Sequence, residues 1–224
     1  MDAILFAKLL PLCHEVGRMY EPGLIYIGGI AVYLHAANTE GVSELSEATQ
    51  DADFYISVAG FSDLREIEEL TANSLQTKHE FRKRDFPFDV YTERHSKLPV
   101  PYANVAACAL SYDGVLVAAP EHLIVLKLEA AINRRESEHG RKDVKDIIRL
   151  LLVAAQMEKT GKAFDADLAC AFMQQGHFDM LGEILKGPEF LALALGNAKT
   201  ANSMRAICAT VMNKIEKAFG AEAS

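Results

Sequence analysis

The chain of 224 residues has no tryptophan and only four cysteines, and it lacks several familiar catalytic motifs. Cys13, Cys108, Cys170 and Cys208 lie far apart without a CxxC pair, which argues against a zinc site and against a disulfide framework. No GxSxG or GxxxxGK(S/T) pattern occurs, so α/β-hydrolase and P-loop chemistry have little support. The unpaired cysteines predict a reducing, cytoplasmic compartment.

Long apolar runs are also missing. The apolar opening from Met1 to Leu12 carries Asp2 and Lys8 and is too short to cross a bilayer, so we expect an amphipathic first helix and no membrane partner. The net charge of −8 argues against broad binding to nucleic-acid phosphates. Two basic clusters, within residues 78–84 and 134–142, are interpreted as solvated surfaces.

Half of the residues are apolar and 24% are charged, which is the composition of a globular protein with a sizeable core. Apolar and β-branched runs predict strands at 24–27, 51–58, 86–91, 105–110 and 115–118, the last two joined at Asp113-Gly114. Helices are expected at 30–37 and from 62 to about 75, an exposed loop at 38–49, and only helices after Pro120. The pattern predicts an α+β fold with a mixed sheet, a core over residues 1–118 and a helical region over 119–224.

Asp51 and Asp53 are the first candidates for chemistry. Side chains alternate along a strand, so residues two apart project to the same face, where two carboxylates can share one magnesium ion. A DxD tripeptide is common, however, and by itself it is more often a solvated strand start.

Gly28 and Gly29 lie between an apolar strand and a helix. Without side chains there, backbone N–H groups and the helix N-terminus can approach phosphate oxygens. A simple tight turn is an equally good interpretation of the pair alone.

Taken together, Gly28-Gly29-Ile30-Ala31-Val32 and Thr49-Gln50-Asp51-Ala52-Asp53-Phe54 resemble the signature of polymerase-β-like nucleotidyltransferases. The stretches 119–130 and 141–147 extend the resemblance to the minimal AbiEii/AbiGii toxin-like group. In that superfamily a third acid comes from a later strand, and Asp89 matches its place. The resemblance implies that Asp51, Asp53 and Asp89 bind Mg²⁺ or Mn²⁺, with Asp89 as third ligand or base.

Lys127 lies on the apolar side of its expected helix, so its ammonium must meet an acid or a phosphate or extend out to water. The resemblance favours phosphate contact and a catalytic role, and on that basis Lys127→Met should weaken NTP binding at unchanged thermal stability. Asp143 and Asp146 match the acids of a following family helix and are weaker nucleotide-binding candidates. Both could equally serve helix stability, through the dipole or through neighbouring cations.

The resemblance therefore implies transfer of a nucleoside monophosphate from an NTP to an RNA or protein acceptor. It also implies a type IV toxin–antitoxin or phage-defence setting with a cognate antitoxin, and residues 119–224 completing the active site. The alternative is a non-catalytic nucleotide-binding or protein-interaction module on the same fold.

Overall fold

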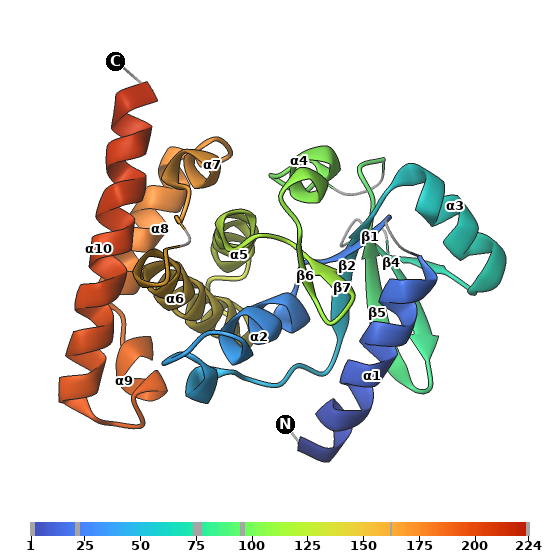
Figure 1. Cartoon of the computed structure of the whole chain (residues 1–224), viewed down its shortest axis with the longest axis horizontal. Coiled ribbons are helices and arrows are strands. Elements are labelled where there is room, and N and C mark those ends of the chain that lie inside the picture. The colour runs from blue at the N-terminus through green and yellow to red at the C-terminus, as the bar shows by residue number, and fades with distance from the viewer. Residues whose placement is uncertain (1–2, 21–22, 74–77, 95–96, 162, 223–224) are drawn as a thin grey trace. The chain divides into compact units, whose positions relative to one another are not determined.

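A computed structural model describes residues 3–20, 23–73, 78–94, 97–161 and 163–222 (Figure 1). The chain forms two compact units. Unit 1 comprises Met1–Leu34 and Glu47–Ala119, and unit 2 comprises His35–Ser46 and Pro120–Ser224. Unit 2 thus includes a short segment from the first half of the chain, in addition to the helices that follow Pro120.

Unit 1 holds one mixed sheet of seven strands in the order β3-β4-β5-β2-β1-β7-β6. The strands are β1 Leu24–Tyr26, β2 Ala52–Ile56, β3 Thr71–Asn73, β4 Lys78–Lys83, β5 Phe86–Tyr91, β6 Leu110–Tyr112 and β7 Val115–Val117. β2 runs parallel to β5 and antiparallel to β1, while β1 runs parallel to β7. The helices of this unit are α1 Ala3–Met19, the start of α2 Gly29–Ala37, α3 Val58–Ile67 and α4 Tyr102–Ala107.

Aromatic side chains fill the core of the sheet. Phe54 of β2 packs edge-on against Tyr26 and Phe81, and Phe81 stacks on Phe88 with ring centroids 5.0 Å apart. The buried Tyr26 hydroxyl donates to the carbonyl oxygen of Cys13 in α1 at 2.9 Å, which satisfies it without water. Strands that carry acidic residues at one end are therefore anchored by a rigid apolar layer.

Unit 2 is helical. It contains the short 3₁₀ helix η1 Ser43–Leu45, α5 Pro120–Asn133, α6 Glu138–Lys159, α7 Ala166–Cys170, α8 Gln175–Lys186, α9 Glu189–Leu193 and α10 Ala198–Glu222. α5 packs along α6, and α10 packs against α6 and α7. Ser137 caps α6 by accepting a hydrogen bond from the Gly140 N–H at 3.0 Å.

Three local expectations were wrong. Residues 105–107 belong to α4 rather than to a strand. The expected hairpin is present with a shorter first strand, because Leu110–Tyr112 pairs antiparallel with Val115–Val117 across Asp113 and Gly114, both at positive φ. α3 begins at Val58 and is capped by Ser57, before the expected start at 62, and it ends at Ile67. Its expected end near 75 lies outside the described residues. The 38–49 segment contains η1 and the buried Val42, so it is more than an exposed loop.

None of the helices in the described part of the chain combines the length and the apolar composition that crossing a bilayer would require.

Candidate functional site

The acidic residues of unit 1 gather where β2 begins. Asp51 immediately precedes β2 and Asp53 is its second residue, and both are half-buried. The Thr49 hydroxyl donates to Asp51 Oδ1 at 2.7 Å, which fixes the orientation of that carboxylate. The Tyr91 hydroxyl of β5 lies 3.5 Å from Asp53 Oδ1. Each acid is thus oriented by a neighbouring hydroxyl.

Asp89 joins this pair through the sheet register. β2 and β5 are parallel, and Asp53 is the direct partner of Asp89, so both side chains project from the same face. Asp89 is only 7% exposed. Burial is the main cause that raises the pKa of Asp89, the charges of Asp51 and Glu80 add to it, and Lys78 opposes it. The structure therefore brings Asp51, Asp53 and Asp89 close enough to interact electrostatically.

Gly28 is in direct contact with this cluster. A Cβ atom at position 28 would lie 2.5 Å from both Cβ and Cγ of Asp53, closer than any real side chain tolerates. The Ile27 N–H also donates to the Asp53 carbonyl oxygen at 3.0 Å, joining the end of β1 to β2. Only glycine fits here, and it brings the backbone that starts α2 against a catalytic candidate. Gly29, which is buried, is the first residue of α2.

The structure adds Lys78, a residue that the sequence interpretation assigned to a solvated surface. Its Nζ atom forms an ion pair with Asp89 Oδ2 and lies 3.3 Å from Glu80 Oε1. Burial acts to lower the pKa of Lys78, but the hydrogen bonds to Asp89 and Glu80 and the charges of Asp89 and Asp53 outweigh it, and the pKa is raised. Lys78 therefore carries its positive charge within the acidic cluster.

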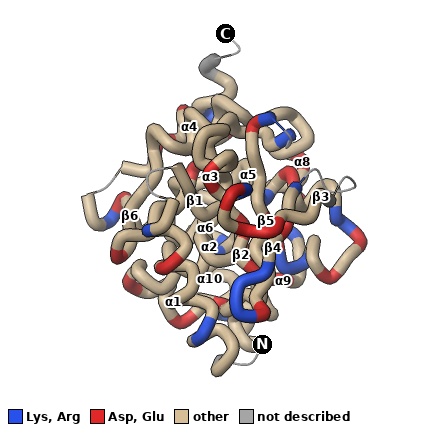
Figure 2. The backbone as a smooth tube through the Cα atoms, turned by 90° about the vertical axis from the view of Figure 1, so that its right-hand side faces the viewer, with Lys and Arg blue, Asp and Glu red and all other residues tan. Residues whose placement is uncertain are grey.

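The basic stretch at the other end of β4 is different. A blue run of the tube lies near the β4 label in Figure 2, and in sequence Arg82 and Lys83 end β4 with Arg84 directly after them. Lys83 pairs with Glu15 and Glu68, and the largely exposed Arg84 pairs with Glu15. These residues match the predicted surface cluster. Lys78, at the other end of β4, differs from them because it contacts the acids of the candidate site.

The fit of a divalent metal differs between the three acids. Among the described residues, no group of three or more His, Cys, Asp or Glu side chains is arranged to hold a metal ion. Asp89 is bound to an ammonium group, whereas Asp51 accepts a hydrogen bond from the neutral Thr49 hydroxyl. Two carboxylates are enough for magnesium that is also held by substrate phosphates. Asp51 and Asp53 thus fit a metal site, and Asp89 as a third ligand stays a prediction.

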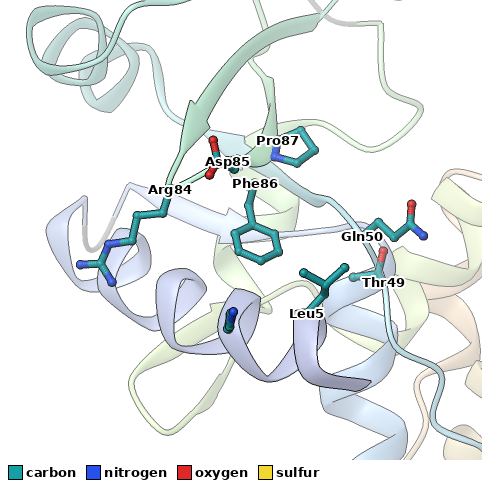
Figure 3. A pocket seen from close by; sticks show the side chains of 8 residues that line it. Leu5, Thr49, Gln50, Arg84, Asp85, Phe86 and Pro87 are labelled. Atoms are coloured by element: carbon teal, nitrogen blue, oxygen red, sulfur yellow. The ribbon is translucent and has the colours of Figure 1, made fainter. Parts of the chain in front are cut away.

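A half-open pocket of about 390 Å³ lies at the same end of unit 1 (Figure 3). It is lined by α1 residues Leu5 and Lys8, by Thr49 and Gln50, and by residues 84–87 of the β4–β5 turn and β5. Phe86 points from its strand toward α1 in Figure 3. Because Thr49 also holds Asp51, the pocket and the acidic cluster share one structural element.

Unit 2 contains a second charged cluster, which includes the remaining candidates. Lys127 Nζ in α5 lies 3.1 Å from Asp143 Oδ1 and 2.7 Å from Asp146 Oδ2 in α6. Arg134 pairs with the other oxygen of Asp143, and Arg149 with the other oxygen of Asp146, both at 2.8 Å. Of the alternatives open for Lys127, contact with acids is the one present.

The cluster also ties the 35–46 segment into unit 2. The Arg149 guanidinium, 2% exposed as a residue, donates from Nε to the carbonyl oxygen of Leu45 in η1 at 2.7 Å. Asp143 and Asp146 are 2% and 3% exposed. These side chains are therefore partners of one another inside the helical unit, and a nucleotide-binding role for Lys127, Asp143 and Asp146 stays a prediction.

No protein-family model and no curated protein matches the chain. Two solved structures do resemble it along nearly its whole length. The protein JHP933 of Helicobacter pylori is 15% identical, with a TM-score of 0.56 over 97% of this chain and 95% of that one. A candidate nucleotidyltransferase from H. pylori is also 15% identical, with a TM-score of 0.51 over 97% of both chains.

At this level of identity the likeness shows the fold alone. The seven-stranded mixed sheet, its flanking helices and the helical C-terminal region together form a nucleotidyltransferase-like fold. The fold class predicted from the sequence is thereby confirmed.

Proposed function

We propose that this protein is a metal-dependent nucleotidyltransferase that transfers a nucleoside monophosphate from an NTP to an RNA or protein acceptor. The observation that carries the proposal is the packing of Asp53 directly on Gly28, at the point where α2 begins. This contact places a carboxylate pair beside a helix N-terminus, and a metal-bound nucleoside triphosphate needs both. Carboxylates hold a divalent cation, and the helix N-terminus holds phosphate oxygens.

The chain's own residues then have defined tasks. The backbone N–H groups at Gly28 and Gly29 hold the triphosphate, and Asp51 and Asp53 hold Mg²⁺ or Mn²⁺. The metal, when bound, neutralises phosphate charge and lowers the pKa of an attacking hydroxyl. The acceptor oxygen bonds to the α-phosphorus, the bond to the β-phosphate bridging oxygen breaks, and pyrophosphate leaves. The hydroxyl proton passes to a base, for which the buried Asp89 is the candidate.

The finer assignment rests on the sequence resemblance. The glycine and DxD motifs and the 119–147 stretch resemble the AbiEii/AbiGii toxin-like group, and we propose a toxin–antitoxin or phage-defence role with a cognate antitoxin as partner. A phosphate-binding role for Lys127, and completion of the site by residues 119–224, belong to the same proposal.

The test is label transfer. Wild-type protein is incubated with each α-labelled NTP, Mg²⁺, and total cellular RNA or protein, and label is sought in macromolecules. Asp51→Asn with Asp53→Asn removes both proposed metal ligands and should abolish transfer. The matched control is Asp63→Asn with Glu66→Gln, which removes two charges from exposed positions on α3 and should transfer as wild type does.

One observation favours a second candidate function. Lys78 already occupies an oxygen of Asp89, as would be expected if the fold served as a non-catalytic nucleotide-binding or protein-interaction module. That alternative predicts NTP binding by calorimetry without label transfer to any acceptor pool. Absence of both binding and transfer in the wild type would overturn the enzyme proposal.

A further inference from the structure

Lys78 stands among the acids of the candidate site. Its side chain and that of Asp89 are each 10% exposed, and the two form a direct ion pair. The second carboxylate near its Nζ atom is Glu80, at 3.3 Å. A buried ammonium of this kind is a compact point charge with three N–H donors. Asp89 therefore already has a cation at one of its oxygens.

Strand register explains how the lysine reaches this position. Glu80 of β4 is the antiparallel partner of Asp89, and Asp53 of β2 is its parallel partner. Side chains alternate along β4, so Lys78 and Glu80 share one face of the sheet with Asp89 and Asp53. The lysine thus lies on the same face as a row of three acids, one from each of three adjacent strands.

We propose that the Lys78 ammonium is the resident cation at Asp89, so that the site takes a single divalent ion, on Asp51 and Asp53, and Asp89 is not a metal ligand. This inference rests on the proposed function, because it specifies the metal stoichiometry of the same site. Lys78 is a positioning residue: it fixes the Asp89 carboxylate and replaces the second metal of a three-carboxylate site. A lysine ammonium carries its charge at neutral pH.

A purely structural ion pair is the competing explanation, and β4 offers a matched control. Lys83 alternates to the opposite face of the same strand and also lies between two carboxylates, 3.7 Å from Glu15 and 3.4 Å from Glu68. Its side chain is on the opposite face of the sheet from those of Asp53 and Asp89. A structural role alone predicts that Lys78→Gln and Lys83→Gln have the same effect on metal binding.

The experiment measures binding of Mn²⁺ alone, by the loss of the free-ion electron paramagnetic resonance signal. Asp51→Asn should weaken Mn²⁺ binding by about tenfold or more, as is typical when a metal site is disturbed. Lys78→Gln should bind Mn²⁺ roughly tenfold more tightly or gain a second ion, because Asp89 and Glu80 lose their cation. Lys83→Gln should bind as the wild type does.

The charge-neutral double variant Lys78→Gln with Asp89→Asn decides whether Asp89 is a ligand. It should bind Mn²⁺ with wild-type affinity, and melting by circular dichroism confirms that it is folded. A loss as large as that of Asp51→Asn would overturn the inference, as would equal behaviour of Lys78→Gln and Lys83→Gln. Failure of the proposed metal site looks different, because Asp51→Asn would then bind Mn²⁺ as tightly as the wild type.

Discussion

Replacement of Lys127 by methionine tests whether the buried cluster of unit 2 supports the fold. The ammonium is shared between Asp143 and Asp146, and its side chain is only 10% exposed. Methionine has a similar length and fills the same apolar surroundings, so the change removes the charge and little packing. Its effect on stability therefore measures the two ion pairs.

The magnitude follows from what each acid retains. Without Lys127, Asp143 keeps Arg134 and Asp146 keeps Arg149, each at 2.8 Å, so neither carboxylate is left without a cation. The loss is then that of charge-assisted hydrogen bonds, about 1.5–3 kcal/mol. Asp146→Asn is worse, because it leaves the 2%-exposed Arg149 without its carboxylate, and breaking a buried pair in this way costs about 3–5 kcal/mol.

The assay is urea unfolding followed by circular dichroism, together with calorimetric titration of an NTP. We expect both variants to unfold at lower urea than the wild type, with Asp146→Asn the less stable of the two. The sequence alone predicted the opposite for Lys127→Met, namely unchanged stability and weaker NTP binding. Unchanged stability of Lys127→Met would refute the reasoning from the ion pairs.

The remaining predictions concern one glycine and one histidine. Gly28→Ala should destabilise the protein by about 1–3 kcal/mol through overpacking against Asp53 and should abolish label transfer. The control Gly182→Ala, which has open space around its position, should have neither effect. Equal melting temperatures of the two variants would contradict this. His122 is fully buried in α5, neither ring nitrogen has a hydrogen-bond partner among the described residues, and burial lowers its pKa below 6.5. The unfolded chain then binds the proton more readily, so stability should fall as pH drops below about 6.5. His122→Leu should flatten the dependence of the melting temperature on pH between about pH 7.5 and pH 5. Equal slopes for the two proteins would contradict this role of His122.

The sequence predicted best those elements whose residues have one dominant preference. The strand at 86–91 and the helix from Pro120 were placed correctly, because aromatic and β-branched residues in the first and an N-terminal proline in the second leave few alternatives. Residues 105–107 were misjudged. Val105 is fully buried, but Ala103, Ala106 and Ala107 of the same segment favour a helix, and this preference prevailed in α4.

The candidate site was predictable in part. Asp51, Asp53 and Gly28 were selected from two local motifs, and the antiparallel pairing of β1 with β2 brings those motifs together. The role of Lys78 depends instead on the register between β4 and β5. The run Lys-His-Glu-Phe-Arg-Lys has a single apolar residue and gives no alternating pattern from which a strand could be predicted.

Lys127 and Lys78 together show why a buried lysine is weak evidence of catalysis. Each lies between two carboxylates of its own unit, as the cost of burying an ammonium requires whatever the function. What differs is the partner. The acids of Lys127 each hold a further arginine, whereas Asp89 shares a face with Asp53, which packs against Gly28. A cation bound at Asp53 would therefore interact with Asp89 and with its partner Lys78. Mn²⁺ binding should respond to replacement of Lys78 and not to replacement of Lys127, and this difference shows which lysine belongs to the site.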